Sequence, residues 1–219
     1  LYMLHTFVVM RWEWAQWFEK RWWKGYLKSR PVADYLKWKK TYWRNFLERI
    51  ELTVPKNSKI LDVGSGPAGI FTILNEFETV ACDPLLSFYE DHIEHFSKSL
   101  YPNTDFVTTS FEVSTWKNEF DFVFCLNVIN HVKEFDIAMK RIVDSAKPSA
   151  QIIISIDCHN FQFPKWLFRK LPIDILHPHQ YNLSEYLSVF ESHGLFINRN
   201  ILIKTGFYFD YYAVVCTKT

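Results

Sequence analysis

The chain has 219 residues, of which 48% are hydrophobic, and its 25 basic and 24 acidic side chains leave a formal net charge of +1. This length and composition predict one folded α/β domain with a modest extension, and they exclude an intrinsically disordered chain. The balanced charge gives no electrostatic reason to expect a bound polyanion, so we expect no nucleic acid as the substrate.

Aromatic residues dominate the first 50 positions, which hold seven of the nine tryptophans. One set recurs at every fourth position, namely Trp14, Phe18, Trp22 and Tyr26. A similar pattern continues from Val32 to Ile50, after a break at Pro31. Both patterns predict amphipathic helices. We therefore predict an aromatic-rich helical cap over residues 1–52.

The cap has three interpretations. Its aromatic side chains can pack over the sheet as core, or the helices can form a lid over a ligand, and these two interpretations overlap. The third is docking at a membrane surface through tryptophans and neighbouring cations, namely Trp12, Trp17, Trp23, Lys20, Arg21, Lys24 and Lys28. We favour the first two, because the same stripe is needed to cover the sheet.

From Lys59 onward, strand-like and helix-like segments alternate. The predicted strands are residues 59–63, 79–82, 105–109, 120–126 and 151–156. The predicted helices are residues 68–77, 84–99, 135–146 and 183–193. Two β-rich runs, residues 195–203 and 207–217, predict a closing antiparallel pair. The pattern predicts a doubly wound, Rossmann-like, mostly parallel sheet of about seven strands with the last antiparallel, formed by residues 53–219.

The strongest local signal is the segment KILDVGSGPAG at residues 59–69. It predicts a buried strand followed by a turn in which Gly64 and Gly66 allow a ligand to approach closely. The helix expected next would aim its free N–H groups at that ligand. Asp62 stands directly before the first glycine, where its charge would repel a pyrophosphate. A purely structural turn is the alternative.

Asp83 ends the second predicted strand, about 20 residues after the glycines. A carboxylate there can accept hydrogen bonds from both hydroxyls of a ribose. It can also serve as the N-cap of the next helix, because Pro84 suits a first helical position. The two roles are compatible.

Four segments together resemble a known family: LDVGSGPAG, VACDP, FDFVFCLNVINHV and AKPSAQIIISID. In order and spacing they are similar to the class I S-adenosylmethionine-dependent methyltransferases, and most similar to the small-molecule branch. The resemblance implies methyl transfer from S-adenosylmethionine to an oxygen or nitrogen atom of a small organic acceptor. The chain departs from the family at residues 147–150, where Lys-Pro-Ser-Ala replaces the usual Lys-Pro-Gly-Gly, at some cost in backbone freedom.

The resemblance also implies roles for individual residues. The methionine and ribose part of the cofactor would contact Asp62, Gly64, Ser65, Gly66 and Ala68. The ribose diol would be held by Asp83, with Pro84 or Leu85 against the adenine, and Ser110 and Phe111 would also contact the adenine. Ser110 stands where the family commonly has an acid, which weakens that contact. The methionine end would face Asn127 and Val128.

The acceptor site is less well defined by the sequence. His131 follows the fourth strand, and its near-neutral reference pKa suits a general base, although a packing role is the alternative. The resemblance places His177 and His179 at the acceptor pocket, and we expect Trp14 and Trp22 to line it as well. We expect no metal site, because the two later histidines lack nearby carboxylate or thiol partners.

Four dispersed cysteines form no CxxC pair, namely Cys82, Cys125, Cys158 and Cys216. Most lie in or beside apolar runs, so we expect free thiols and a reducing, cytoplasmic setting. No apolar run reaches the roughly 20 residues that span a bilayer, and the opening LYMLHTFVVM is too short for a complete signal peptide.

Two other functions remain open. An NAD-dependent oxidoreductase would share the glycine turn and the ribose acid, but Asp62 and the NVINHV segment argue against it. A non-catalytic binding module would keep the fold, and Ser110 with the altered Lys-Pro turn is compatible with that function. The intact glycines and Asp83 favour the enzyme.

Overall fold

The computed structural model describes residues 2–159 and 181–219, and within the first helix it describes the side chains of Trp14 and of Gln16 onward. Five helices are defined: α1 (Tyr2–Leu27), α2 (Val32–Arg49), α3 (Leu86–His92), α4 (Phe135–Ser145) and α6 (Leu183–Ser192). The strands are β1 (Lys59–Val63), β2 (Glu78–Cys82), β3 (Thr104–Val107), β4 (Phe120–Leu126), β5 (Ala146–His159), β6 (Leu195–Lys204) and β7 (Phe209–Lys218).

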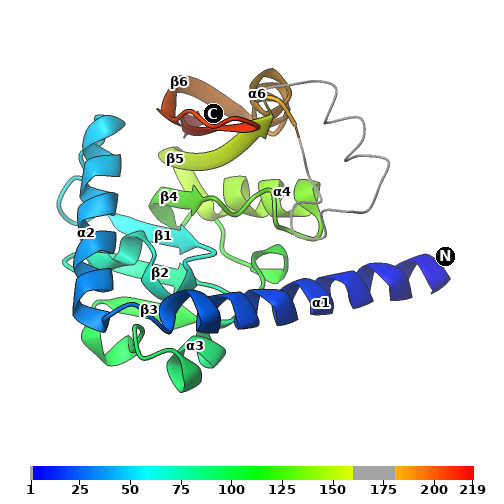
Figure 1. Cartoon of the computed structure of the whole chain (residues 1–219). Helices are drawn as coiled ribbons and strands as arrows, with labels where there is room; N and C mark the ends of the chain where they lie inside the picture. Colours follow the sequence, from blue (N-terminus) through cyan, green and yellow to red (C-terminus); the bar gives the residue numbers. More distant parts are fainter. Residues whose placement is uncertain (1, 160–180) are drawn as a thin grey trace.

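The strands form one seven-stranded sheet in the order β3-β2-β1-β4-β5-β7-β6 (Figure 1). Strands β1 to β5 pair in parallel, whereas β7 runs antiparallel to both β5 and β6. The predicted doubly wound sheet with an antiparallel closing strand is confirmed. The strand order reverses between β1 and β4, and open sheets of this kind bind ligands at the carboxyl ends of the strands at that point.

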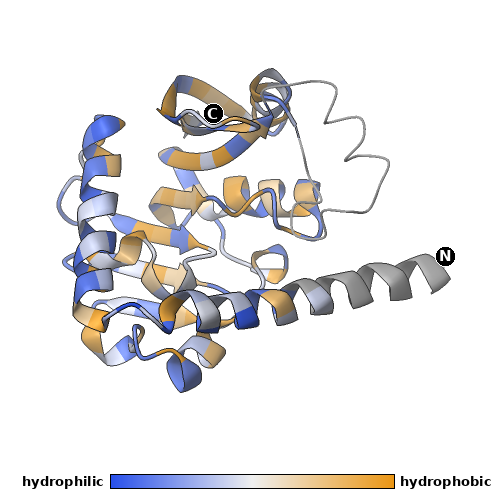
Figure 2. Cartoon of the chain, in the orientation of Figure 1, coloured by the Kyte–Doolittle hydropathy of each residue, from blue (hydrophilic) through white to orange (hydrophobic). Residues whose placement is uncertain are grey.

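Helices cover both faces of the sheet (Figure 1). On one face, Trp43 and Phe46 of α2 pack against sheet residues such as Ile60 and Phe124. On the other face, α4 and α6 pack against the alternate strand residues, for example through Phe190. Hydrophobic colour is concentrated on the strands between these layers (Figure 2). The core therefore lies on both sides of the sheet, as expected when parallel strands are buried on both faces.

Helix α2 follows the sequence pattern closely. It begins directly after Pro31, and Tyr35, Trp43 and Phe46 are its buried side chains. The indole Nε1 of Trp43 donates a hydrogen bond to the carbonyl of Ala68, 3.0 Å away. This bond ties α2 to the glycine turn after β1.

Most of the predicted aromatic stripe on α1 is exposed and does not pack as core. Trp14, Phe18 and Trp22 are 58%, 42% and 54% exposed, so packing as core is wrong for these three residues. Two other residues, Trp23 and Leu27, contact the domain instead. None of the described helices is both long and apolar enough to cross a membrane.

The segment after the glycine turn is not the predicted helix over residues 68–77. It forms two short 3₁₀ turns, η1 (Gly66–Ala68) and η2 (Ile70–Ile73), separated by Gly69 in an extended conformation. The extended backbone of Gly69, with ψ −172°, interrupts the helical path between the two turns. The N–H of Phe71 in the second turn binds the side chain of Asp62, which ties this turn to β1.

Two further predicted elements have different bounds. Helix α3 stops at His92 rather than at residue 99, because the Glu90 carboxylate accepts the N–H of Lys98 at 2.9 Å and closes a turn. Strand β5 starts at Ala146, five residues before the prediction, and includes the unusual Lys-Pro-Ser-Ala segment. Ser149 there has φ 62°, a left-handed conformation that glycine adopts without strain.

Candidate active site

The glycine turn lies at the carboxyl end of β1. Gly64 and Gly66 have φ values of 62° and 57°, which side-chain-bearing residues rarely adopt. A Cβ atom at Gly64 would lie 2.5 Å from the side chain of Val128, and one at Gly66 would lie 3.6 Å from the ring of Trp23. The turn is therefore enclosed by the loop after β4 on one side and by α1 on the other.

The N–H groups of this turn already have partners. Those of Gly64 and Ser65 both donate to the carbonyl of Cys82, at 2.7 and 3.1 Å. The N–H of Gly66 donates to Asp83 Oδ2 at 3.0 Å, and that of Phe71 to Asp62 Oδ2 at 3.1 Å. The helix that was expected to aim its free N–H groups at a ligand does not form, and the N–H groups of Gly64, Ser65 and Gly66 are bound within the protein. Because these donors are satisfied by the protein, the turn does not form a phosphate cradle of the dinucleotide type.

Asp83 connects the glycine turn to the start of α3. Its Oδ2 accepts from Gly66, and its Oδ1 accepts the N–H of Leu85 at 2.7 Å. The side chain therefore caps the chain after β2, and the remaining lone pairs of the two oxygens can accept further hydrogen bonds. Burial, together with the negative charge of Glu19, raises the pKa of Asp83 to about 7.

A second buried carboxylate lies beside the first. Asp62 is 2% exposed, and burial raises its pKa to about 7, with a further contribution from the charge of Asp83. Glu19 of α1 adds a third acid: its Oε1 accepts hydrogen bonds from Trp23 Nε1 and Tyr89 Oη, each at 3.4 Å. Burial raises the pKa of Glu19 as well. The three acids repel one another, so a cation placed among them would be stabilised.

Lys39 of α2 faces the same turn from the opposite direction. Its Nζ lies 4.6 Å from the ring centroid of Trp43 and 5.4 Å from that of Tyr42. Burial lowers the pKa of Lys39 to about 8, and the negative charge of Asp62 partly opposes this shift. The site therefore carries acids around the glycines and one half-buried cation on the side of α2.

Sequence analysis missed both Glu19 and Lys39. Between residues 14 and 31, Glu19 is the one acidic residue in the sequence, and this isolation within an aromatic and basic helix was the available signal. Lys39 is one of three lysines within residues 37–40, and periodicity alone does not separate it from the exposed Lys37. Both residues reach the site from the helical cap, whereas the recognisable motifs lie in the sheet.

The residues predicted to contact the adenine lie after β2 and β3. Pro84 follows Asp83 at the carboxyl end of β2, and Ser110 precedes the 3₁₀ turn η4 (Phe111–Val113). Phe111 is buried against Trp116, while the Ser110 hydroxyl binds the carboxylate of Glu112. The other oxygen of Glu112 accepts the N–H of Lys133 at 2.9 Å, which joins this loop to the loop after β4.

The loop after β4 contains the residues predicted for the methionine end. Asn127 has φ 59°, and its N–H donates to the carbonyl of Ser155 at 3.0 Å. Val128 packs on Gly64, and the N–H of His131 closes a turn onto the carbonyl of Val128 at 2.8 Å. His131 is exposed, so its ring is accessible from solvent.

A polar network lies next to this loop, at the carboxyl end of β5. The hydroxyls of Ser155 and Tyr211 are 2.6 Å apart, and Tyr211 also hydrogen-bonds to Tyr42 of α2. Asp157 is the register partner of Tyr211, and its charge acts on both tyrosines. Burial raises the pKa of both phenols, so they remain protonated donors at neutral pH. None of these residues was singled out from the sequence.

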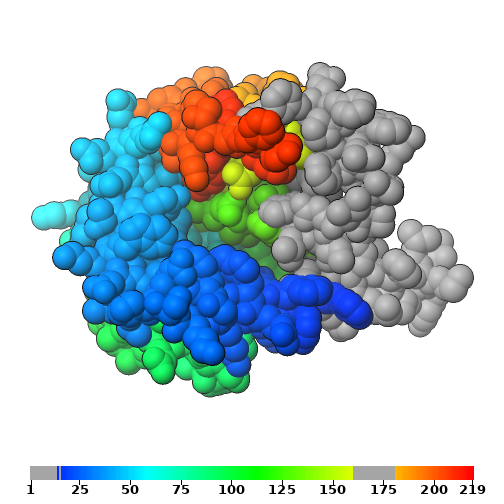
Figure 3. Space-filling model, viewed as in Figure 1, coloured from blue at the N-terminus to red at the C-terminus, as the bar shows by residue number. Residues whose placement is uncertain are grey.

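A hollow is visible on one face of the molecule (Figure 3). In that view the hollow lies between the helical N-terminal part of the chain and the C-terminal strands, with the middle of the chain at its floor. Of the residues predicted for the acceptor pocket, His177 and His179 lie outside the described residues. Trp14 and Trp22 are exposed on α1, and a role in the pocket stays a prediction for them. Within the described residues, no group of three potential metal ligands is present.

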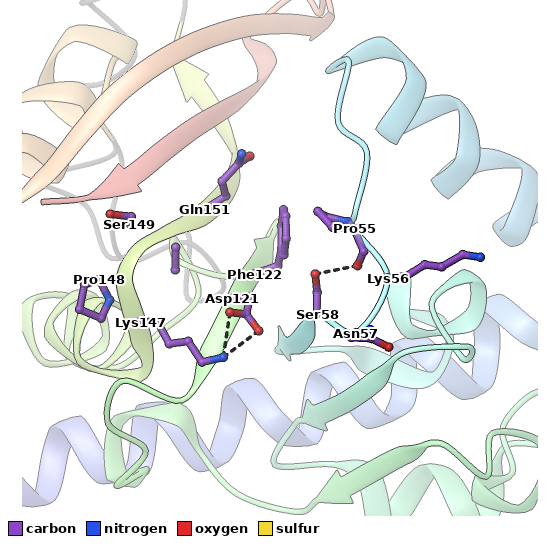
Figure 4. A pocket seen from close by; sticks show the side chains of 11 residues that line it. Pro55, Lys56, Asn57, Ser58, Asp121, Phe122, Lys147, Pro148, Ser149 and Gln151 are labelled. Atoms are coloured by element: carbon purple, nitrogen blue, oxygen red, sulfur yellow. Dashed lines mark hydrogen bonds and ion pairs between the residues drawn. The ribbon is translucent and has the colours of Figure 1, made fainter.

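A separate cavity of about 460 Å³ lies at the opposite, amino-terminal ends of β1 and β4 (Figure 4). Two of its charged groups are paired with each other: Lys147 Nζ lies 2.8 and 2.9 Å from the two carboxylate oxygens of Asp121, while Lys56 is exposed at the cavity. Asp121 Oδ2 also accepts the N–H of Lys59 at 2.8 Å. Because Lys147 and Asp121 satisfy one another, the cavity offers no cluster comparable with that at the carboxyl ends.

Comparison with known proteins identifies a family that matches most of the chain. A family model described as a methyltransferase domain matches residues 35–198. A search of curated protein sequences finds no match.

Solved structures give the same fold at low sequence identity. The cyclase SpnF has a TM-score of 0.64 and 12% identity, covering 82% of this chain and 80% of its own. A Methanosarcina mazei S-adenosylmethionine-dependent methyltransferase has a TM-score of 0.60 and 16% identity, covering 77% and 96%. The Burkholderia thailandensis 1,6-didemethyltoxoflavin-N1-methyltransferase, with 1,6-didemethyltoxoflavin and S-adenosylhomocysteine bound, has a TM-score of 0.62 and 11% identity, covering 98% and 89%.

Proposed function

Because this chain belongs to the methyltransferase-domain family and is a class I S-adenosylmethionine-dependent methyltransferase, we propose that it methylates an oxygen or nitrogen atom of a small organic acceptor. The observation that carries the proposal is the pair of buried carboxylates, Asp62 and Asp83, that holds the glycine turn at the strand-order reversal. A turn of this kind suits a ligand that brings positive charge and hydroxyl groups instead of a pyrophosphate.

The charges of the site fit the cofactor. S-adenosylmethionine carries a sulfonium, an ammonium and one carboxylate. Asp62, Asp83 and Glu19 are mutually repelling acids whose pKa values are raised by burial, so bound cations would relieve their repulsion. Lys39 is the matching cation for the carboxylate, and its Coulombic contact with Asp62 supports a position beside the methionine part. The residues present therefore fit the cofactor.

We assign the contacts along the cofactor by the order of the strands. Asp83, at the end of β2, would accept from the ribose hydroxyls, and the adenine would lie towards Pro84, Ser110 and Phe111. The methionine part would lie over Gly64 and Gly66, with its carboxylate on Lys39. Asn127 and Val128, at the end of β4, would line the methyl end. The remaining predicted contacts are Ser65 and Ala68, which lie in the same turn.

Methyl transfer asks the protein mainly to position the acceptor and to remove a proton. When bound, the cofactor supplies an electrophilic methyl on a positively charged sulfur. Positioning the acceptor in line with it accounts for much of the rate enhancement. His131 stays our candidate for the general base, because it follows β4 and is accessible from solvent.

The Tyr42–Tyr211–Ser155 network is our candidate wall of the acceptor site. It lies past the end of β4, on the side of the sheet away from β2 and Asp83. Two protonated phenols and a serine hydroxyl can donate to an acceptor oxygen, and Asp157 supplies a nearby carboxylate. If the network belongs to the acceptor side, Tyr211→Phe should leave S-adenosylhomocysteine affinity within about twofold while lowering stability by about 1 kcal/mol, the usual value of one hydrogen bond.

A small acceptor is supported by two further observations. The formal charge of the whole chain is close to zero, which gives no broad attraction for nucleic acid. The Burkholderia protein, which aligns with almost all of this chain, has a small heterocycle bound.

The four cysteines are all buried and free, which supports a reducing, cytoplasmic setting for the reaction.

Two measurements test the proposal. Calorimetric titration should show S-adenosylmethionine binding, and failure to bind at millimolar cofactor with the protein folded would refute the site. A metabolite library should then be screened for release of S-adenosylhomocysteine. Turnover only with protein or nucleic-acid substrates would leave the enzyme class intact and overturn the small acceptor. Preferential binding of NADH would instead favour an oxidoreductase.

A further inference from the structure

The outward side of α1 carries an unusual set of exposed aromatic residues. Trp14, Trp17, Phe18 and Trp22 are 58%, 51%, 42% and 54% exposed, and we call them the aromatic face of α1. Their spacing of three, four and eight residues places them on one side of a helix. With about 150–250 Å² of surface on each aromatic side chain, the exposed area is roughly 400 Å². Apolar patches of this size on a monomer are commonly functional.

The opposite side of α1 is attached to the domain, which fixes the orientation of the aromatic face. Glu19 hydrogen-bonds to Tyr89 of α3, Trp23 packs near Gly66 of the glycine turn, and Leu27 is 3% exposed. The helix therefore has a docked side and an aromatic side, and the aromatic side points away from the core. Figure 1 shows α1 extending from the body of the molecule.

Charge is distributed very unevenly between the cap and the rest of the chain. Residues 1–50 contain eleven Lys and Arg and four Asp and Glu, a formal charge of +7, while residues 51–219 carry −6. Arg21 and Lys24 are exposed on α1 itself, and Lys28 is exposed directly after its last residue. The guanidinium of Arg21 lies 4.8 Å from the ring centroid of Trp17, within the aromatic face. The near-zero net charge of the chain thus hides a basic, aromatic helix.

We propose that the aromatic face of α1 docks on the surface of an anionic lipid bilayer. Tryptophan is the side chain that prefers the headgroup layer, and neighbouring lysines and arginines are attracted to anionic lipids. A single convex helix suits a flat surface, whereas single-stranded nucleic acid is usually held in a basic groove. Helix α1 would lie along the membrane, with its docked side still holding Glu19 and Trp23 at the glycine turn.

Vesicle flotation tests this docking directly. The full chain should float with vesicles of equimolar phosphatidylcholine and phosphatidylglycerol and stay at the bottom with phosphatidylcholine alone. Binding should weaken as salt is added, because exposed charges are screened. The double variant Trp17→Ser/Phe18→Ser should lose at least tenfold in vesicle affinity, while the matched control Phe196→Ser, an exposed aromatic on β6, should bind as the parent does.

A charge variant separates the two contributions. Lys24→Gln/Lys28→Gln should weaken binding to anionic vesicles roughly 25-fold, because each of the two basic residues near such a surface contributes about fivefold. Thermal unfolding of every variant should match the parent, which excludes loss of the fold. The proposal is overturned if the parent fails to float or if the aromatic variant floats as well as the parent. It is also overturned if single-stranded RNA binds more tightly than the vesicles, or if light scattering shows a dimer that the aromatic variant dissociates.

Discussion

Replacing Lys39 by methionine removes a cation that acts on Asp62 beside the glycine turn, while keeping a long apolar side chain against Trp43. If Lys39 binds the carboxylate of the methionine part, the variant loses a charge-assisted interaction worth roughly 1.5–3 kcal/mol. Affinity for S-adenosylhomocysteine should then fall roughly tenfold to hundredfold. Stability should not fall with it, because burial already disfavours the charge and lowers the pKa of Lys39 to about 8.

The assay is calorimetric titration with two ligands that differ in the amino-acid group. S-adenosylhomocysteine has the carboxylate, whereas 5′-methylthioadenosine keeps the adenosine and lacks it. Lys39→Met should weaken only the first ligand, Asp83→Asn should weaken both, and Lys37→Met, on the exposed side of α2, should weaken neither. An equal loss of both ligands in Lys39→Met, or no loss of the first, would refute the assignment of Lys39 to the carboxylate.

Three further predictions test the turn and its charges. Binding of S-adenosylmethionine should be strongest between about pH 7 and 8, because the cofactor favours ionised Asp83 (pKa about 7) and protonated Lys39 (pKa about 8); a flat titration profile from pH 6 to 9 would contradict this. Gly64→Ala should abolish cofactor binding and lower the unfolding temperature, because its Cβ would lie 2.5 Å from a neighbouring side chain, whereas Gly25→Ala, with nothing within 4 Å, should stabilise α1 by about 0.5–1 kcal/mol. Ser149→Gly should stabilise the protein by about 1 kcal/mol in denaturant unfolding, because φ is 62° there, and no gain would show that the conformation is unstrained.

The raised acid pKa values also determine how stability depends on pH. In the free protein, burial raises the pKa values of Asp62 and Asp83 to about 7, whereas the unfolded chain releases these protons near the ordinary aspartate pKa of 3.8. The native state therefore binds more protons across this range, and this contribution to the unfolding free energy falls as the pH rises from about 4 to 7. Cofactor binding should release protons near neutral pH. The two buried acids therefore lower the stability of the free protein as the pH rises, while they increase its affinity for the cofactor.

The sheet was predictable from sequence because its strands are buried on both faces. The bounds of β1 and β4 agree with the predicted residues 59–63 and 120–126, since each is a near-continuous apolar run ended by a turn. The position of Asp83 at the carboxyl end of β2 was also predictable, because it directly follows a strand in the sequence. Such features depend on local pattern alone.

The features that the sequence did not predict depend on contacts between segments that are distant along the chain. Periodicity found an aromatic stripe on α1 but could not say which side faces the domain, which is decided by Glu19, Trp23 and their partners on α3 and the glycine turn. Tyr211 meets Ser155 only because β7 is inserted beside β5. The second short turn after Gly66 also makes such a contact, since a side chain from β1 accepts the N–H of Phe71.

The satisfied N–H groups of the glycine turn have a consequence for the kinetics of ligand exchange. Because the N–H groups of Gly64, Ser65 and Gly66 are hydrogen-bonded to Cys82 and Asp83, the turn is preorganised before any ligand binds. No segment of this turn must fold on encounter, so little conformational entropy is lost there when the cofactor binds. Amide hydrogens of the turn should accordingly exchange slowly with solvent in the free protein. Entry and departure of the cofactor would then be governed by passage through the hollow, and not by assembly of the loop.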